Sequence, residues 1–179
     1  VIPWQQILRQ FVGTAGRVGR TSTWKRSHRR FGHDTPGLRK RQLLNLVVGI
    51  DVSDSTDTQP LRETFARELL QIAHGRQSRV TVLYAGSRIQ KVQKFTGNPQ
   101  VTEVYRGGGF TDLRPVFDYA RKMQPRPAAI IYLTDGFGPP PEQSDIPTLW
   151  VLSPDGQKPV DWGLELRLDD LRQDKINGD

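Results

Sequence analysis

One apolar run, from Leu43 to Ile50, restricts what this chain can fold into more than any other feature. The run is apolar at nearly every position and does not alternate, which is typical of a β-strand covered on both faces, as in a parallel sheet packed between helices. Oxygen-bearing side chains follow at once, with Asp51, Ser53 and Ser55 at every second position. The sequence therefore predicts a buried central strand that emerges into a loop rich in oxygen ligands.

The remaining apolar patterns alternate between strand and helix. We predict further strands over residues 79–84, 88–95, 128–134, 147–152 and 163–168, and helices over 3–12, 60–74 and 112–123. This order is typical of an open, mostly parallel sheet, because right-handed crossovers place helices on both of its faces. We therefore expect an α/β fold, Rossmann-like and doubly wound, in which 88–95 is one short antiparallel edge strand.

Charge divides the chain into unequal parts. Residues 1–41 hold ten Lys or Arg residues and one acid, whereas residues 42–179 hold 16 Lys or Arg residues and 18 acids. The overall charge of +7 therefore belongs to the N-terminal segment. We expect an N-terminal helix and a basic arm over 1–41, packed on or preceding the domain, one domain over 42–170, and a flexible tail over 171–179.

Composition excludes several classes of protein and site. The sequence has no Cys, which excludes disulfides and thiolate metal sites and makes a reducing cytoplasm the expected location. No apolar stretch approaches the ~20 residues that span a membrane, and the N-terminus lacks the pattern of a signal peptide. Because position 1 is Val, we expect a processed chain or a longer parent protein.

Three separate segments bring oxygen ligands to one edge of the predicted sheet. Asp51 and Asp135 come at the carboxyl ends of central strands, and Thr111 opens the predicted helix before the second of them. Ligands of such sheets bind beyond the carboxyl ends of the strands, where the strand order switches. Carboxylate and hydroxyl oxygens are the donors that hard divalent cations prefer. We therefore predict a Mg²⁺ or Mn²⁺ site made by Asp51, Ser53, Ser55, Thr111 and Asp135.

Neutral ligands would leave much of the positive charge on such an ion. Three of the five predicted ligands are hydroxyls, so we expect one coordination position to accept an oxygen from outside the chain, and an anionic carboxylate would fill it best. The predicted function is therefore the binding of a protein that exposes Asp or Glu. We do not expect an enzyme, because no general acid/base pair is evident beside the ligands.

Other interpretations of these residues stay open. Thr111 and Asp112 also suit the start of a helix, and the run Gly107–Gly109 also suits a phosphate-binding loop. Asp51 resembles the nucleophile of some hydrolases, although Ser53 stands where those enzymes need a second acid, and metal-dependent hydrolysis is a further enzymatic alternative. The basic arm is either a solvated strap or a nucleic-acid-binding segment that would contact phosphates.

The predicted ligands resemble a known motif. Asp51, Ser53 and Ser55 in the pattern D-x-S-x-S, Thr111 after a glycine run, and Asp135 in a Leu-Thr-Asp-Gly turn resemble the metal-ion-dependent adhesion site of von Willebrand factor A (VWA) domains. This resemblance implies that the hydroxyls of Ser53, Ser55 and Thr111 bind the metal directly. It implies that Asp51 and Asp135 bind the metal directly or through water.

A wider resemblance covers nearly the whole chain, over residues 4–168. Segments 23–31, 107–112 and 149–152 look like a bacterial VWA-like family whose domain follows a helical, metallopeptidase-like region and is often encoded near MoxR-type AAA+ ATPases. The resemblance implies an AAA+ ATPase assembly, or a substrate delivered to it, as the partner. It also implies an alternative role as the non-catalytic C-terminal part of a metallopeptidase-like protein. Asp54 departs from the motif, which usually has Gly there, so its carboxylate either changes the metal affinity or points to solvent.

Overall fold

The computed structural model describes residues 4–15, 44–52, 64–65, 67–69, 71–72, 78–95 and 110–168. Its strands are β1 (Leu44–Asp51), β2 (Ser78–Ala85), β3 (Ile89–Phe95), β4 (Ala129–Thr134), β5 (Thr148–Leu152) and β6 (Leu164–Arg167), and helix α3 is Arg114–Lys122. Residues 4–15 form an N-terminal helix, and the described residues between 64 and 72 are also helical. In this part of the chain, no helix has the length and apolar character needed to cross a membrane.

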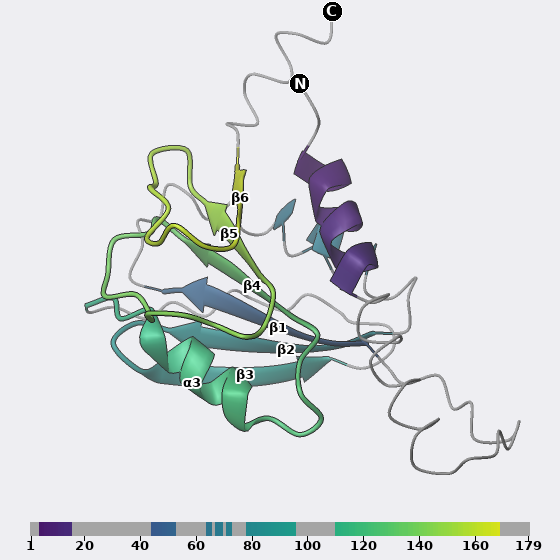
Figure 1. The fold of residues 1–179 in the computed structure, drawn as a ribbon, viewed down its shortest axis with the longest axis horizontal. Coiled ribbons are helices and arrows are strands. Elements are labelled where there is room, and N and C mark those ends of the chain that lie inside the picture. Colours follow the sequence, from purple (N-terminus) through teal and green to yellow (C-terminus); the bar gives the residue numbers. More distant parts are fainter. Residues whose placement is uncertain are drawn as a thin grey trace, which may run out of the picture.

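Six strands form one sheet in the order β3-β2-β1-β4-β5-β6. Every neighbouring pair is parallel except β2 and β3, so β3 is the antiparallel edge strand. These features confirm the predicted α/β, Rossmann-like, mostly parallel fold. The chain runs from β1 to one side through β2 and β3 and returns to the other side through β4, so the strand order switches between β1 and β4 (Figure 1). Ligands of open α/β sheets bind at such a switch.

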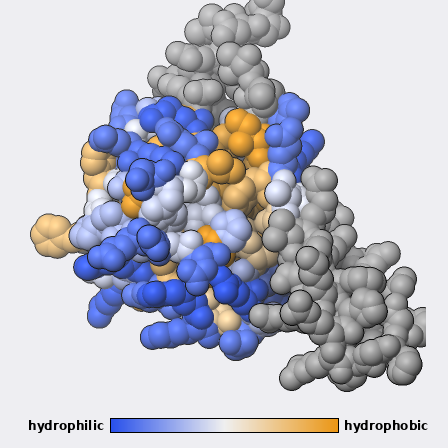
Figure 2. Space-filling model, viewed as in Figure 1, coloured by the Kyte–Doolittle hydropathy of each residue, from blue (hydrophilic) through white to orange (hydrophobic). Residues whose placement is uncertain are grey.

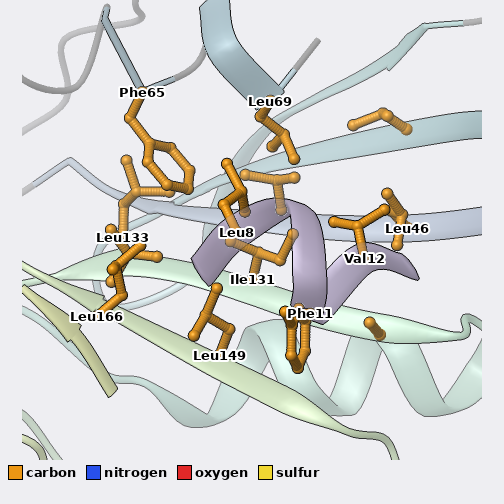
Figure 3. Packing of buried hydrophobic residues seen from close by; sticks show 14 of the residues in the cluster. Leu8, Phe11, Val12, Leu46, Phe65, Leu69, Ile131, Leu133, Leu149 and Leu166 are labelled. Carbon is orange, nitrogen blue, oxygen red and sulfur yellow. The ribbon is translucent and has the colours of Figure 1, made fainter. Parts of the chain in front are cut away.

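Alternate residues of the strands face opposite sides of the sheet and enter two separate cores. Leu46, Ile131 and Leu149 belong to the core that Leu8 and Phe11 of the N-terminal helix enter (Figure 3). Burying a large apolar side chain stabilises a fold by about 1.5–3 kcal/mol relative to exposing it. The N-terminal helix is therefore a structural part of the folded core.

Helix α3 covers the opposite face, where aromatic rings dominate the packing. Phe117 of α3 lies 5.5 Å from Trp150 and 6.1 Å from Tyr132, measured between ring centroids. Gly49 of β1 makes room for these rings, because a Cβ atom there would lie 3.1 Å from Tyr132 Cγ and 3.1 Å from Val116 Cγ1. Helices on both faces explain why β1 has no polar face.

Observed helix boundaries differ from the predicted ones at two places. Helix α3 begins at Arg114 and not at 112, because the Arg114 N–H donates to Asp112 Oδ1 at 3.0 Å in a turn that precedes the helix. The N-terminal helix continues past its predicted end, because Ala15 is still buried in the core. The basic arm and the C-terminal tail lie outside the described residues and stay predictions.

Candidate metal centre

Asp51 is the last residue of β1, and its side chain is completely buried, with an exposed fraction of 0%. In the register of the sheet it lies beside Ala85 of β2, and the β1–β4 register continues to place it beside Thr134. The Val52 N–H donates to the Ala85 carbonyl at 3.0 Å, which extends the β1–β2 pairing past Asp51. A carboxylate is unfavourable to bury unless donors or a cation surround it.

Two threonine hydroxyls from different elements donate to the Asp51 carboxylate. Thr134 Oγ1 donates to Asp51 Oδ2 at 2.8 Å and itself accepts the Gly136 N–H at 3.0 Å. Thr111 Oγ1 lies 3.3 Å from Asp51 Oδ1 and 3.5 Å from Oδ2, so one proton is shared between both oxygens. The structure thus brings together Asp51 and Thr111, two of the predicted ligands.

Asp135 follows directly at the end of β4, where it shapes a tight turn. Its Oδ1 accepts the Phe137 N–H at 3.0 Å, and its carbonyl accepts the Gln157 N–H at 2.8 Å. Asp135 therefore directly follows Thr134, whose hydroxyl donates to Asp51. Ser53 and Ser55 lie outside the described residues, so their place at the site stays a prediction.

The loop that carries Thr111 is held on two sides. The Asp112 N–H donates to the Gly86 carbonyl at 2.9 Å. On the other side Gly138 packs so closely that a Cβ atom there would lie 2.9 Å from Thr111 Cγ2. Thr111 is therefore a fixed part of this edge, and its hydroxyl contacts Asp51 and does not cap α3, whose N-cap residue is Leu113.

The charges of Asp51 and Asp112 affect a buried tyrosine near this edge of the sheet. The Tyr132 hydroxyl is buried and has no hydrogen-bond partner in the part of the chain that the structure describes. Burial, and then the charges of Asp51 and Asp112, raise the pKa of this hydroxyl. Arg114 bonds both oxygens of Asp112, at 2.9 and 2.8 Å, and these bonds hold the pKa of that carboxyl below its ordinary value. Arg114 thus balances the charge of Asp112, whereas the charge of Asp51 reaches the core around Tyr132.

The side chains that converge at this edge offer oxygen donors. Within the described ranges, no three His, Cys, Asp or Glu side chains cluster so as to hold a metal. A cation here would therefore depend on hydroxyl oxygens as well as carboxylates, and hard ions such as Mg²⁺ accept both. Asp51 and Thr111 fit such an ion, because their oxygens meet at one point.

Sequence reasoning missed two residues that position this site. Thr134 orients the Asp51 carboxylate. Arg167, at the end of β6, donates through Nη1 to the carbonyls of Pro154 at 2.8 Å and Gly156 at 2.7 Å, and so holds the loop whose Gln157 supports Asp135. A threonine at a strand end and an arginine on an edge strand are both common, so no sequence pattern marked either one.

Replacing Arg167 by methionine is expected to lower the free energy of unfolding by about 1–2 kcal/mol, because hydrogen bonds from a charged donor are lost. Arg121→Met is the control: Arg121 pairs with Asp118 on the exposed surface of α3, so its loss should change stability by no more than about 0.5 kcal/mol. Urea unfolding measures both variants. Equal effects would show that Arg167 does not hold the loop.

A family model described as VWA-like domain (DUF2201) matches residues 46–169. The chain belongs to this family. The match includes β1 from Leu46 onward, the other five strands, α3 and the three described residues of the candidate site, Asp51, Thr111 and Asp135. It confirms the VWA-like fold that the sequence predicted.

One protein with a similar sequence also bears on the length of the parent protein. An uncharacterized protein of Thermotoga maritima is 27% identical over 135 residues, which are 75% of this chain and 33% of that protein. The matched part of the chain thus spans about a third of the length of this relative. No solved structure matches the chain.

Proposed function

We propose that this VWA-like domain is a protein-recognition module that depends on a divalent cation. Membership of a VWA-like family suggests a protein-interaction module in general terms. The proposed ion is Mg²⁺ or Mn²⁺, with Asp51, Ser53, Ser55, Thr111 and Asp135 as its ligands. The observation that carries the proposal is the contact of Thr111 with the buried Asp51 where the strand order switches.

The residues of the site have distinct roles in this proposal. Asp51 supplies negative charge from the buried end of β1, and Thr134 fixes the direction of its carboxylate. Thr111 adds a neutral oxygen from a separate loop, and Asp135 adds a second carboxylate at the rim. When bound, the cation supplies an attachment point for an anionic oxygen from outside the chain.

The proposed occupant of that attachment point is an Asp or Glu side chain of a partner protein. Hydroxyl ligands leave positive charge on a cation, and a partly desolvated rim strengthens its attraction to a carboxylate compared with bulk water. By the resemblance described above, the partner would be a MoxR-type AAA+ ATPase or a substrate delivered to it.

We propose binding and not catalysis for this domain. Asp51 is completely buried, and both of its oxygens receive hydroxyl protons, so it is poorly placed to attack a substrate. If a longer parent chain carries a metallopeptidase-like region, this domain would be its non-catalytic C-terminal part.

Nucleic-acid binding by the basic arm is the second candidate, and the ten Lys or Arg residues among residues 1–41 favour it. Contacts to phosphates would make the affinity fall steeply with salt and leave it unaffected by EDTA. Tight, EDTA-insensitive binding of oligonucleotides at physiological salt would rank this function above metal-dependent recognition.

Isothermal titration calorimetry with Mg²⁺ and Mn²⁺ tests the proposal. We expect one site in the wild type and an affinity at least about tenfold weaker in Thr111→Val, which keeps the side chain's size but removes its oxygen. Thr148→Val is the matched control, because the Thr148 hydroxyl donates to the Ile146 carbonyl at 2.9 Å at the opposite end of the sheet. No heat of binding in the wild type, or equal affinities in the wild type and Thr111→Val, would contradict the proposal.

A further inference from the structure

Two exposed phenylalanines stand on the loops that meet at the candidate metal centre. Phe110 directly precedes Thr111 and is 88% exposed, and Phe137, two residues after Asp135, is 59% exposed. Of the large apolar side chains in the described residues, four are exposed, and these two are the aromatic ones. Exposed aromatic side chains beside a polar site are typical of residues that contact another protein.

The two loops that carry the phenylalanines touch each other at Gly138 and Thr111. A Cβ atom on Gly138 would lie 2.9 Å from Thr111 Cγ2 and 2.9 Å from the Thr111 carbonyl oxygen. The Phe137 N–H donates to Asp135 Oδ1 at 3.0 Å, which fixes the second loop to the site. Phe110 and Phe137 therefore rise from backbone that the site already holds, and this limits the entropy lost when a partner orders them.

Two arginines stand on segments that adjoin the Thr111 loop. Arg88 is exposed beside the turn whose Gly86 carbonyl accepts the Asp112 N–H, and the Arg114 side chain is 56% exposed. Figure 2 shows an apolar side chain that projects from the left edge of a largely hydrophilic surface, the edge toward which β1 points in Figure 1. The exposed phenylalanines and the basic Arg88 thus stand on segments that carry or adjoin the candidate site.

We infer that the partner segment carries its Asp or Glu beside large apolar side chains, which pack on Phe110 and Phe137 while the carboxylate reaches the site at Asp51 and Thr111. This inference rests on the proposed function and adds the chemistry of the residues that flank the acid. Charge complementarity supports an acidic segment, because the exposed Arg88 lies in the turn whose Gly86 carbonyl accepts the Asp112 N–H of the Thr111 loop.

The paired arginine and the carboxylates at this edge disfavour a nucleic acid as the occupant. Stacking of bases on aromatic rings requires a basic path for the phosphates. Here the exposed Arg114 is paired with Asp112, and the carboxylate of Asp135 accepts the Phe137 N–H, so negative charge lies next to this phenylalanine. A protein segment with one acid and several apolar side chains matches this mixture better than a chain of phosphates.

Selection from a random peptide library displayed on phage tests the inference. The 179-residue chain is immobilised, and selections run in parallel with Mg²⁺ and with EDTA. We expect Mg²⁺-dependent clones in which Asp or Glu stands beside Leu, Ile, Phe or Trp. A fluorescein-labelled peptide from the most frequent clone is then titrated by fluorescence anisotropy.

The double variant Phe110→Ser/Phe137→Ser is expected to bind this peptide at least about tenfold more weakly, as is usual when interface aromatics are removed. Its Mg²⁺ affinity, measured by calorimetry, should equal that of the wild type. Leu164→Ser is the matched control: Leu164 is 56% exposed at the far end of β6 and should not affect peptide binding. Thr111→Val should weaken the binding of both Mg²⁺ and the peptide.

Each other outcome is decisive. Selected peptides with an acid but no apolar neighbours, or an unchanged affinity of the double phenylalanine variant, would overturn this inference and leave the proposed function standing. An absence of Mg²⁺-dependent clones would also overturn it, and calorimetry would then decide the proposed function separately. A labelled single-stranded oligonucleotide that binds the wild type but not the double variant would assign the phenylalanines to nucleic acid.

Discussion

Gly136→Ala is expected to lower the free energy of unfolding by about 2–5 kcal/mol, a large share of the stability of a single domain. Gly136 has a φ of +87°, a left-handed conformation that disfavours other residues by roughly 1–2 kcal/mol. A Cβ atom there would also lie 1.6 Å from the Gln157 carbonyl oxygen. Because that oxygen belongs to the main chain, the loop must move, and the hydrogen bond from Gln157 to Asp135 moves with it.

Gly163→Ala is the matched control for this prediction. Gly163 also has a positive φ, +82°, but a Cβ atom there would lie 3.0 Å from its nearest neighbour, Trp150 Nε1. We expect Gly163→Ala to lower the free energy of unfolding, measured with urea, by only about 1–2 kcal/mol. If Gly136→Ala lowered the free energy of unfolding no more than Gly163→Ala does, the loop at Gln157 would move aside easily. This edge of the sheet would then not be rigid.

Burial on two faces made the fold predictable, because it removes polar positions from the central strands. Leu46 and Ile131 face the core that the N-terminal helix enters, whereas Val47 and Tyr132 face the core beneath α3. Strands β1 and β4 therefore appear in the sequence as continuous apolar runs. The end of the N-terminal helix was not predictable in the same way. Gly13 is a poor helix former, yet it is buried within the helix, and tertiary packing outweighs its propensity.

The candidate site could be predicted only where parallel topology determines position. Asp51 and Thr111 were expected to converge, because the carboxyl ends of parallel strands and the loops near them share one edge. The contact between Thr134 and Asp51 depends on the exact β1–β4 register, and threonine is ordinary in a strand. The bonds of Arg167 depend on the path of an irregular loop, which no periodic pattern encodes.

Asp51→Asn is expected to abolish the stabilisation that Mg²⁺ gives to the wild type. A ligand that binds only the folded state raises the free energy of unfolding by RT ln(1 + [L]/Kd), about 2.7 kcal/mol at a hundredfold excess over Kd. Asparagine keeps the shape of the side chain but carries no charge and accepts through one oxygen. The buried end of β1 therefore loses its attraction for a cation. Urea unfolding in Mg²⁺ and in EDTA measures this increment for each protein.

The difference in unfolding free energy between Mg²⁺ and EDTA separates the effect of metal binding from the effect of the substitution on the fold itself. Removing the carboxylate changes stability by itself, through weaker bonds from Thr111 and Thr134 and through a smaller desolvation penalty. Those contributions are the same in Mg²⁺ and in EDTA, so they cancel in the increment. Asp145→Asn makes the same change of charge at a side chain that is 83% exposed, before β5 at the opposite end of the sheet, and should keep the full increment. If Asp51→Asn also kept it, the cation would bind elsewhere on the chain. If the wild type showed no increment, the role of Asp51 would be to accept the two threonine hydroxyls and join three segments of the fold.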